Sequence, residues 1–255
     1  MSAIAAEGLA FRYGKKSEYA LTNLSFTIED GEFVCVLGHS GCGKSTLLNL
    51  IMGFLHPTEG RVLVNGAPVT GPGVDRGIVF QDYSLFPWMT AKENVAFGIR
   101  QAKGVSKAEA AHTAEDILAR MSLTDSLGKY PCELSGGMRQ RVAIARVLAM
   151  DAGIWLFDEP FSALDVQMRA SLQALVEQLW SAGETRRTVV FVTHNVNEAI
   201  NLADRILFIG KNGAHHDLRV PLKRPRRSEA SLNDPAYSVL TRQLAELFSD
   251  EEAEA

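Results

Sequence analysis

The sequence predicts an α/β protein built around a sheet with mainly parallel strands. Short apolar runs alternate along the chain with turn residues and helical patterns. Two runs, Ile154 to Phe157 and Val189 to Val192, are apolar throughout, which is typical of strands buried on both faces of a sheet. An amphipathic helix is expected between them, because apolar residues recur there at three- and four-residue spacing: Leu172, Leu175, Val176 and Leu179.

The composition is that of one large globular domain. The 255 residues, 46% hydrophobic and 22% charged, are enough to bury a substantial core. No run of eighteen apolar residues and no secretory signal is visible, so we expect a soluble, cytoplasmic protein. Cys35, Cys42 and Cys132 are widely spaced, which favours reduced thiols over disulfides or a zinc site. Acidic residues in the last six positions account for the net charge of −4, so a nucleic-acid binder is disfavoured.

Two pairs of strands are expected near the N-terminus. Leu24 to Ile28 and Phe33 to Leu37 flank the turn at residues 29–32, and we expect them to pair as antiparallel strands. Arg61 to Val64 is followed by Asn65-Gly66, which predicts a second hairpin because this dipeptide suits a tight two-residue turn.

Helical signals replace strand signals from Ala91 to about Tyr130, which predicts a helical subdomain inserted into the α/β core. Ser106 and Glu109 have the spacing of a capping box at a helix start. We therefore expect a single domain over residues 1–255, with a core at about 1–90 and 150–215, a helical subdomain at about 91–149 and a tail at about 216–255.

The tail carries a basic run that is interrupted by Pro221 and Pro225. We expect this run to be a solvated loop, with a role in binding lipid headgroups as the alternative. Its basic residues are Arg219, Lys223, Arg224, Arg226 and Arg227.

A phosphate-binding loop is predicted at Gly38-His39-Ser40-Gly41-Cys42-Gly43-Lys44-Ser45, which fits G-x-x-x-x-G-K-[ST]. It follows an apolar strand and precedes a helical pattern, a context that disfavours the alternative of a glycine-rich turn with a chance lysine. The glycines let backbone N–H groups face the phosphates, Lys44 adds a full charge, and Ser45 offers a hydroxyl to Mg²⁺. His39 and Cys42 are expected to contribute only backbone N–H groups.

A pair of carboxylates, Asp158 and Glu159, ends the apolar run from Ile154 to Phe157. Ligands of open parallel sheets bind at the carboxyl ends of strands. Alternation along a strand sends neighbouring side chains to different places, so Asp158 is expected to hold Mg²⁺ through its water and Glu159 to act as general base on the attacking water. The alternative is a strand end that enters a solvated turn.

With these motifs the sequence resembles the ATP-binding cassette ATPases over nearly its whole length. The most diagnostic stretch is Leu134-Ser135-Gly136-Gly137-Met138-Arg139-Gln140-Arg141, which is similar to the family signature. Further matches follow in family order: Tyr13 for stacking on adenine, Gln81 for the glutamine loop, Ser162-Ala163-Leu164-Asp165 for the loop after the carboxylates, and His194 for the switch histidine. Singly, each could be a strand cap, a helix cap or a packed aromatic residue.

The resemblance implies a P-loop NTPase core with a mixed, mainly parallel sheet, an antiparallel β subdomain and an inserted helical subdomain. It implies ATP hydrolysis with Glu159 and His194 as catalytic residues, and Mg²⁺ held by Ser45, Gln81 and Asp158. The residues that it implies for binding ATP are Tyr13, Gly38, His39, Ser40, Gly41, Cys42, Gly43, Lys44, Ser45, Thr46, Gln81, Ser135, Gly136, Gly137 and Met138.

The resemblance also implies partners. Two copies would stack head to tail, with the signature of one covering the ATP of the other, where Ser135 and the start of its helix meet the γ-phosphate. The dimer would serve two transmembrane permease subunits on the cytoplasmic face of the membrane and, indirectly, a solute-binding protein. Residues 83–88 would offer aromatic surface to a permease helix near Gln81; alternatively they pack within the helical subdomain.

Residues 71–83 and 86–90, together with Met138, look like the branch that takes up nitrate, sulfonates and taurine, so import of such an anion is the favoured function. Asn195 stands where an aspartate commonly follows the switch histidine, which leaves the orientation of His194 open. The rival functions are an exporter or lipid-handling ATPase and a DNA-repair ATPase, whose long coiled coils have no counterpart here.

Overall fold

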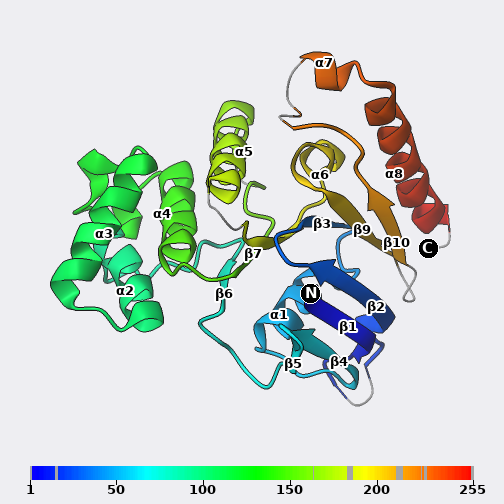
Figure 1. Ribbon diagram of the computed structural model, residues 1–255, viewed down its shortest axis with the longest axis horizontal. Helices are drawn as coiled ribbons and strands as arrows, with labels where there is room; N and C mark the ends of the chain where they lie inside the picture. The colour runs from blue at the N-terminus through cyan, green and yellow to red at the C-terminus, as the bar shows by residue number, and fades with distance from the viewer. Residues whose placement is uncertain are drawn as a thin grey trace. The chain divides into compact units, whose positions relative to one another are not determined.

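The computed structural model describes residues 2–14, 17–162, 164–182, 186–210, 215–224, 226 and 229–253. Ala163, Pro225, Arg227 and Glu254, which belong to the loop, the basic run and the acidic end discussed above, lie outside these residues. The chain divides into two compact units, one made of residues 1–72 and 184–255 and the other of residues 73–183. Figure 1 shows the helices and strands of each unit.

The first unit contains an antiparallel sheet with the strand order β2-β1-β4-β5. Its strands are β1 (Ser2–Phe11), β2 (Leu21–Glu29), β4 (Glu59–Val64) and β5 (Ala67–Pro68). The hairpin predicted at Asn65-Gly66 is confirmed, because Val64 pairs with Ala67 and both turn residues have positive φ, 51° and 78°.

The predicted hairpin between the second and third strands is wrong. β3 (Phe33–Leu37) lies between β8 (Thr188–Val192) and β9 (Arg205–Ile209) and runs parallel to both, whereas β2 pairs with β1. All five residues of β3 are buried, while β2 alternates between buried and exposed positions. A strand that is apolar on both faces belongs in the middle of a covered parallel sheet. The turn between them therefore leads from one sheet to the other.

Among its described residues the first unit also has four helices, and β10 (His215–Arg219) runs antiparallel to β9 at one edge of the parallel strands. The helices are α1 (Lys44–Met52), α6 (Val196–Leu202), α7 (Glu229–Leu232) and α8 (Pro235–Ala253). In Figure 1, α8 lies alongside α6 and the β9–β10 pair. Leu240 and Leu244 are buried on the inner face of α8.

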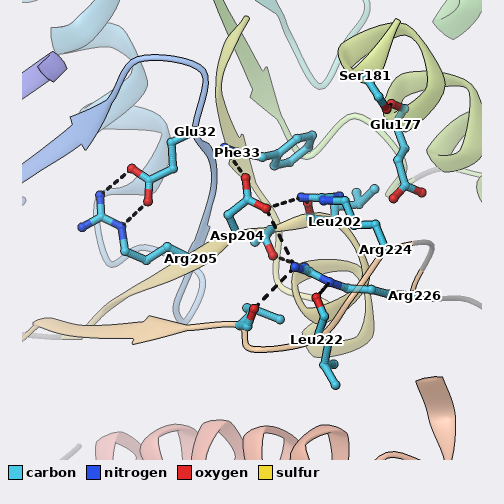
Figure 2. Close-up of polar contacts among 12 residues, drawn as sticks. Glu32, Phe33, Glu177, Ser181, Leu202, Asp204, Arg205, Leu222, Arg224 and Arg226 are labelled. Atoms are coloured by element: carbon cyan, nitrogen blue, oxygen red, sulfur yellow. Dashed lines mark hydrogen bonds and ion pairs between the residues drawn. The ribbon is translucent and has the colours of Figure 1, made fainter. Parts of the chain in front are cut away.

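Two residues of the basic run, Arg224 and Arg226, anchor the tail, which corrects the expectation of a solvated loop at these positions, whereas Arg219 and Lys223 are exposed. Figure 2 shows Arg224 donating a 2.8 Å hydrogen bond to the carboxylate of Asp204. Arg226 is 3% exposed, and its guanidinium lies 3.8 Å from the same carboxylate. Arg226 also donates to four backbone carbonyls, of Leu222, Ile200, Ala203 and Val220. Two of these belong to the end of α6, where helix carbonyls need outside partners, so the charge is buried with compensation.

The second unit pairs two parallel strands, β6 (Arg76–Val79) and β7 (Ile154–Asp158). Its helices are α2 (Ala91–Lys103), α3 (Lys107–Arg120), α4 (Gly136–Ala149) and α5 (Val166–Ser181), with short 3₁₀ turns at Thr124–Ser126 and Pro131–Glu133. The amphipathic helix expected before β8 is α5, and its buried face includes Leu172 and Val176.

Two helix starts in the second unit are capped by hydroxyl side chains, and of the capping box predicted at Ser106 and Glu109 the structure shows the serine half. The Ser106 hydroxyl accepts a hydrogen bond from the backbone N–H of Glu109 at 3.2 Å. A reciprocal capping box, with both of its hydrogen bonds, begins α2 at Thr90 and Glu93. Over the residues that the structure describes, no helix is both long and apolar enough to span a membrane.

Candidate functional site

The loop between β3 and α1 holds the predicted phosphate-binding residues. Gly38, Gly41 and Gly43 have positive φ values of 153°, 87° and 94°, which curl the backbone so that successive N–H groups can face one ligand. Gly43 is also crowded, since a Cβ there would lie 2.4 Å from the carbonyl oxygen of Ala20. Only glycine combines this φ with so close an approach.

Lys44 begins α1 and is held by the loop itself. Its side chain is 5% exposed, and Nζ donates to the carbonyl oxygens of Gly38 at 2.8 Å and His39 at 2.7 Å. An ammonium group has three N–H donors. The third has a weak acceptor in the Cys42 sulfur at 3.9 Å, so a phosphate oxygen would be a far stronger partner.

Tyr13 presents an exposed ring beside this loop. The residue is 68% exposed, its hydroxyl lies 2.8 Å from the Thr46 hydroxyl in the first turn of α1, and its ring meets Phe11 edge to face. A cavity of about 230 Å³ is lined by Tyr19, Gly41 and neighbouring residues of the same unit. An aromatic face fixed next to a phosphate loop can stack on a planar base.

His194 lies at the same edge of the sheet as the phosphate loop. Val36 of β3 is in register with Val192 of the parallel strand β8, and the N–H of Thr193 donates to the Val36 carbonyl at 3.1 Å. Both strands therefore end together, so Gly38 and exposed His194 both follow the carboxyl edge of the sheet, where ligands of parallel sheets bind.

A buried hydrogen-bond cluster fixes the backbone on both sides of His194. The Thr193 hydroxyl donates to the Glu198 carboxylate at 2.6 Å and accepts from the N–H of Asn195 at 3.0 Å. Glu198 is 6% exposed, so these hydrogen bonds are shielded from water. The sequence reasoning missed this cluster, which holds His194 in place.

Asn195 has a structural role of its own. Its side-chain oxygen accepts from the N–H of Glu198 at 3.2 Å and caps α6. Asparagine caps helices about as well as aspartate, so the aspartate charge is not needed to start α6 after His194. The spacing Asn-x-x-Glu, which resembles a capping box, was the signal for this role.

In the second unit, β6 and β7 end at one edge and bring their following residues together. Val79 is in register with Phe157, so Gln81 leaves the sheet near Asp158 and Glu159. The expected alternation stops at Asp158, because Glu159 has a φ of 44° and has already left the strand. The hydroxyl and N–H of Ser162 hold this bend by donating to the Glu159 carbonyl at 3.1 and 3.3 Å. A non-glycine residue in this conformation costs roughly 1–2 kcal/mol and points to a functional constraint.

The signature residues form the start of α4. The Ser135 hydroxyl accepts from the N–H of Met138 at 3.3 Å and caps the helix. A Cβ on Gly137 would lie 3.2 Å from the Met168 side chain, so glycine lets the end of α4 approach α5 closely. Exposed Ser135 thus stands at a positively polarised helix end that suits an anion.

The comparisons with known proteins agree with this geometry. The model of the family described as ABC transporter matches residues 21–162. The chain belongs to the ABC transporter family. A bicarbonate transport ATP-binding protein, CmpD of Synechocystis, is 46% identical over 222 residues, which cover 85% of this chain and 78% of that protein. A taurine import ATP-binding protein, TauB of Chromobacterium violaceum, is 41% identical over 262 aligned residues, which cover 100% of this chain and 99% of that protein.

A solved ATP-binding cassette supports the fold of this ABC ATPase. A dimeric structure of a post-hydrolysis state, bound to ADP and Pi, superposes with a TM-score of 0.76 at 34% identity, covering 86% of this chain and 100% of that chain. The predicted P-loop NTPase fold, the family and an ATPase coupled to transport are confirmed. The nucleotide that this ABC ATPase domain binds is therefore ATP.

Two rings of the aromatic segment, residues 83–88, pack on arginine side chains of this ABC protein. Arg139 lies over the Tyr83 ring at 5.5 Å and Arg146 over the Phe86 ring at 5.7 Å, so both rings pack within the second unit. Trp88 is 69% exposed, and its ring centroid lies 5.6 Å from that of Phe86. The expected aromatic surface is therefore narrower than residues 83–88.

Proposed function

We propose that this chain energises the import of a small anion by hydrolysing ATP on the cytoplasmic face of a membrane transporter. The phosphate loop supports this proposal most directly. Two carbonyl oxygens of the loop hold Lys44 beside the backbone N–H groups, and the exposed ring of Tyr13 lies next to the first turn of α1. The direction and cargo rest on the relatives, whose names describe bicarbonate transport and taurine import.

Each residue of the site has a proposed role in ATP hydrolysis. Lys44 and the loop amides bind the phosphates, and Tyr13 stacks on the adenine. Glu159, held by Ser162 in its bent conformation, takes a proton from the attacking water as general base, and His194 contacts the γ-phosphate. Hydrolysis then breaks the bond between the γ-phosphorus and the bridging oxygen, and ADP leaves with that oxygen.

The three side chains proposed to hold Mg²⁺ all offer oxygen donors. Ser45 offers an exposed hydroxyl in the first turn of α1, Asp158 a half-buried carboxylate at the end of β7, and Gln81 an amide oxygen. These are hard oxygen donors of the kind that Mg²⁺ takes together with substrate phosphates. Bound there, the ion would neutralise charge on the phosphates.

Two copies of the chain form the working unit in this proposal. The helix start at Ser135, Gly136 and Gly137 meets the γ-phosphate of ATP that is bound to the other copy. The ATP-bridged dimer docks on two permease subunits through surface that includes Trp88, and a solute-binding protein delivers the anion from the far side of the membrane.

Gel filtration of Glu159→Gln tests the composite site. This variant should retain ATP and run as a dimer with ATP and as a monomer with ADP. The control is the double variant Glu159→Gln with Ser135→Ala, which should bind ATP as a monomer. A monomer with ATP for the single variant, both alone and with its permease subunits, would contradict the head-to-tail arrangement.

Uptake by cells tests direction and cargo. Cells that depend on this transporter should accumulate one of taurine, nitrate or bicarbonate, and Lys44→Ala should abolish the uptake. Efflux that depends on Lys44, with no uptake of any small anion, would show that the transporter works as an exporter and not as an importer.

A further inference from the structure

The C-terminal helix α8 packs on the first unit through one face. Tyr237, Leu240, Leu244 and Phe248 recur at three- and four-residue spacing on this face, where Leu240 is 4% and Leu244 0% exposed. The Tyr237 hydroxyl donates to the Asn197 side chain of α6 at 3.1 Å, and burial raises the pKa of Tyr237. The helix is therefore docked, not solvated.

The last turns of α8 reach the phosphate loop. The Phe248 ring meets Phe208 of β9 and His39 of the loop, each edge to face, with ring centroids 5.0 Å apart. The His39 ring nitrogen Nε2 lies 3.0 Å from the Phe248 carbonyl oxygen, a hydrogen bond between residues 209 positions apart. His39 was expected to act through its backbone alone, and this contact corrects that expectation.

His39 connects this contact to the ligand-binding groups of the loop. Its side chain is held by α8, and its carbonyl oxygen accepts from Lys44 Nζ at 2.7 Å. The conformation of this one residue therefore affects both the docking of α8 and the position of the lysine. Fixing a loop in the conformation that binds a ligand removes part of the ordering cost at binding.

We propose that α8, through the contact of Phe248 with His39, positions the phosphate loop for nucleotide, so that α8 docking and ATP binding strengthen each other. The inference rests on the proposed nucleotide site and adds to it a positioning role for the C-terminal tail. Linkage makes the effect reciprocal: if docked α8 raises ATP affinity by some factor, ATP must favour docking by the same factor.

Variants on α8 test the first half of this reciprocity. Phe248→Ala should raise the ATP dissociation constant by roughly 2- to 10-fold, the factor that corresponds to one edge-on aromatic contact. Val239→Ala is the matched control, because Val239 is 50% exposed on the same helix and should leave the constant unchanged. His39→Ala combined with Phe248→Ala should weaken binding no more than the stronger single variant, because each removes the same contact.

Hydrogen exchange of the full chain tests the second half. In the wild type, ATP should slow the amide exchange of residues 237–248. The factor should equal the factor by which Phe248→Ala raises the ATP dissociation constant. In His39→Ala, which leaves the inner face of α8 intact, ATP should no longer change this exchange.

The outcomes separate the two proposals. Wild-type protein that binds ATP with unchanged exchange in α8, together with an unchanged dissociation constant in Phe248→Ala, would overturn the coupling and leave the nucleotide site standing. Additive losses in the double variant would show that Phe248 acts on the fold without His39. Wild-type protein that does not bind ATP would overturn the proposed site itself, and the coupling with it.

Discussion

Two glycines of the phosphate loop offer a test of why the loop has its shape. Gly41 and Gly43 have similar φ values, 87° and 94°, so alanine pays a similar penalty of roughly 1–2 kcal/mol at either position. Their surroundings differ. A Cβ at Gly41 would meet nothing within 4 Å, whereas at Gly43 it would lie 2.4 Å from the Ala20 carbonyl oxygen and 2.7 Å from the Leu21 side chain.

The overlap at Gly43 cannot be relieved by rotating a side chain. The N–H of Ala20 donates to the Phe11 carbonyl at 2.8 Å, and Leu21 is 4% exposed, so the opposing chain is fixed. Overpacking of this kind adds about 1–3 kcal/mol. We therefore expect Gly43→Ala to lower the free energy of unfolding by about 2–5 kcal/mol, and Gly41→Ala by about 1–2 kcal/mol.

Urea denaturation of both variants measures this difference, and the backbone penalty cancels between them. Gly43→Ala should also bind ATP more weakly, because the loop must shift away from Ala20. Equal losses of stability, or a larger loss for Gly41→Ala, would show that steric overlap at Gly43 does not determine the shape of the loop.

Three further predictions concern the buried guanidinium of Arg226, the buried thiol of Cys35 and the helix cap at Asn195. Arg226→Met should lower the free energy of unfolding by about 3 kcal/mol or more, because it leaves buried carbonyls unpaired, whereas the exposed neighbour Lys223→Met should change it by less than about 0.5 kcal/mol in the same urea titration. Burial raises the pKa of the Cys35 thiol well above its ordinary value, so a thiol reagent at pH 8 should label exposed Cys132 first and Cys35 only at the rate of unfolding, as mass spectrometry of the labelled peptides would show. Asn195→Asp should keep both the melting temperature and the ATPase rate near wild type; a large loss of rate would mean that the capping interaction is not what matters at this position.

The parts of the site that could be predicted from sequence are those whose structure is determined by residues adjacent in the chain. The loop from Gly38 to Ser45 needs its glycines, lysine and serine at fixed spacing, so the motif alone determines most of the structure of this loop. The same is true of Ser135, which caps the helix that follows it. Fully apolar runs likewise identified β7 and β8, because such runs are stable only when both faces are covered.

The parts that were not predicted depend on distant partners. The edge at which β3 pairs is decided by β8 and β9, which follow it by more than 150 residues, so a short turn after β2 was misleading. Arg226 is buried because Asp204 and the end of α6 meet it, and no local pattern distinguishes such a residue from a solvated one. The contact of His39 with Phe248 has the same origin.

The short connection between the two sheets of the first unit has a further consequence. Tyr13 follows β1, the partner of β2, and only three residues join β2 to β3, which leads into the phosphate loop. The Gly31 N–H donates a hydrogen bond to the Thr188 hydroxyl, and an ion pair between Glu32 and Arg205, shown in Figure 2, also secures this connection. The Tyr13 ring, which we propose stacks on the base, and the phosphate loop are thus joined within one unit by a short connection and by the contact of the Tyr13 hydroxyl with Thr46. In the proposed site, the distance between the stacked base and the phosphate loop is therefore fixed by the fold of the first unit.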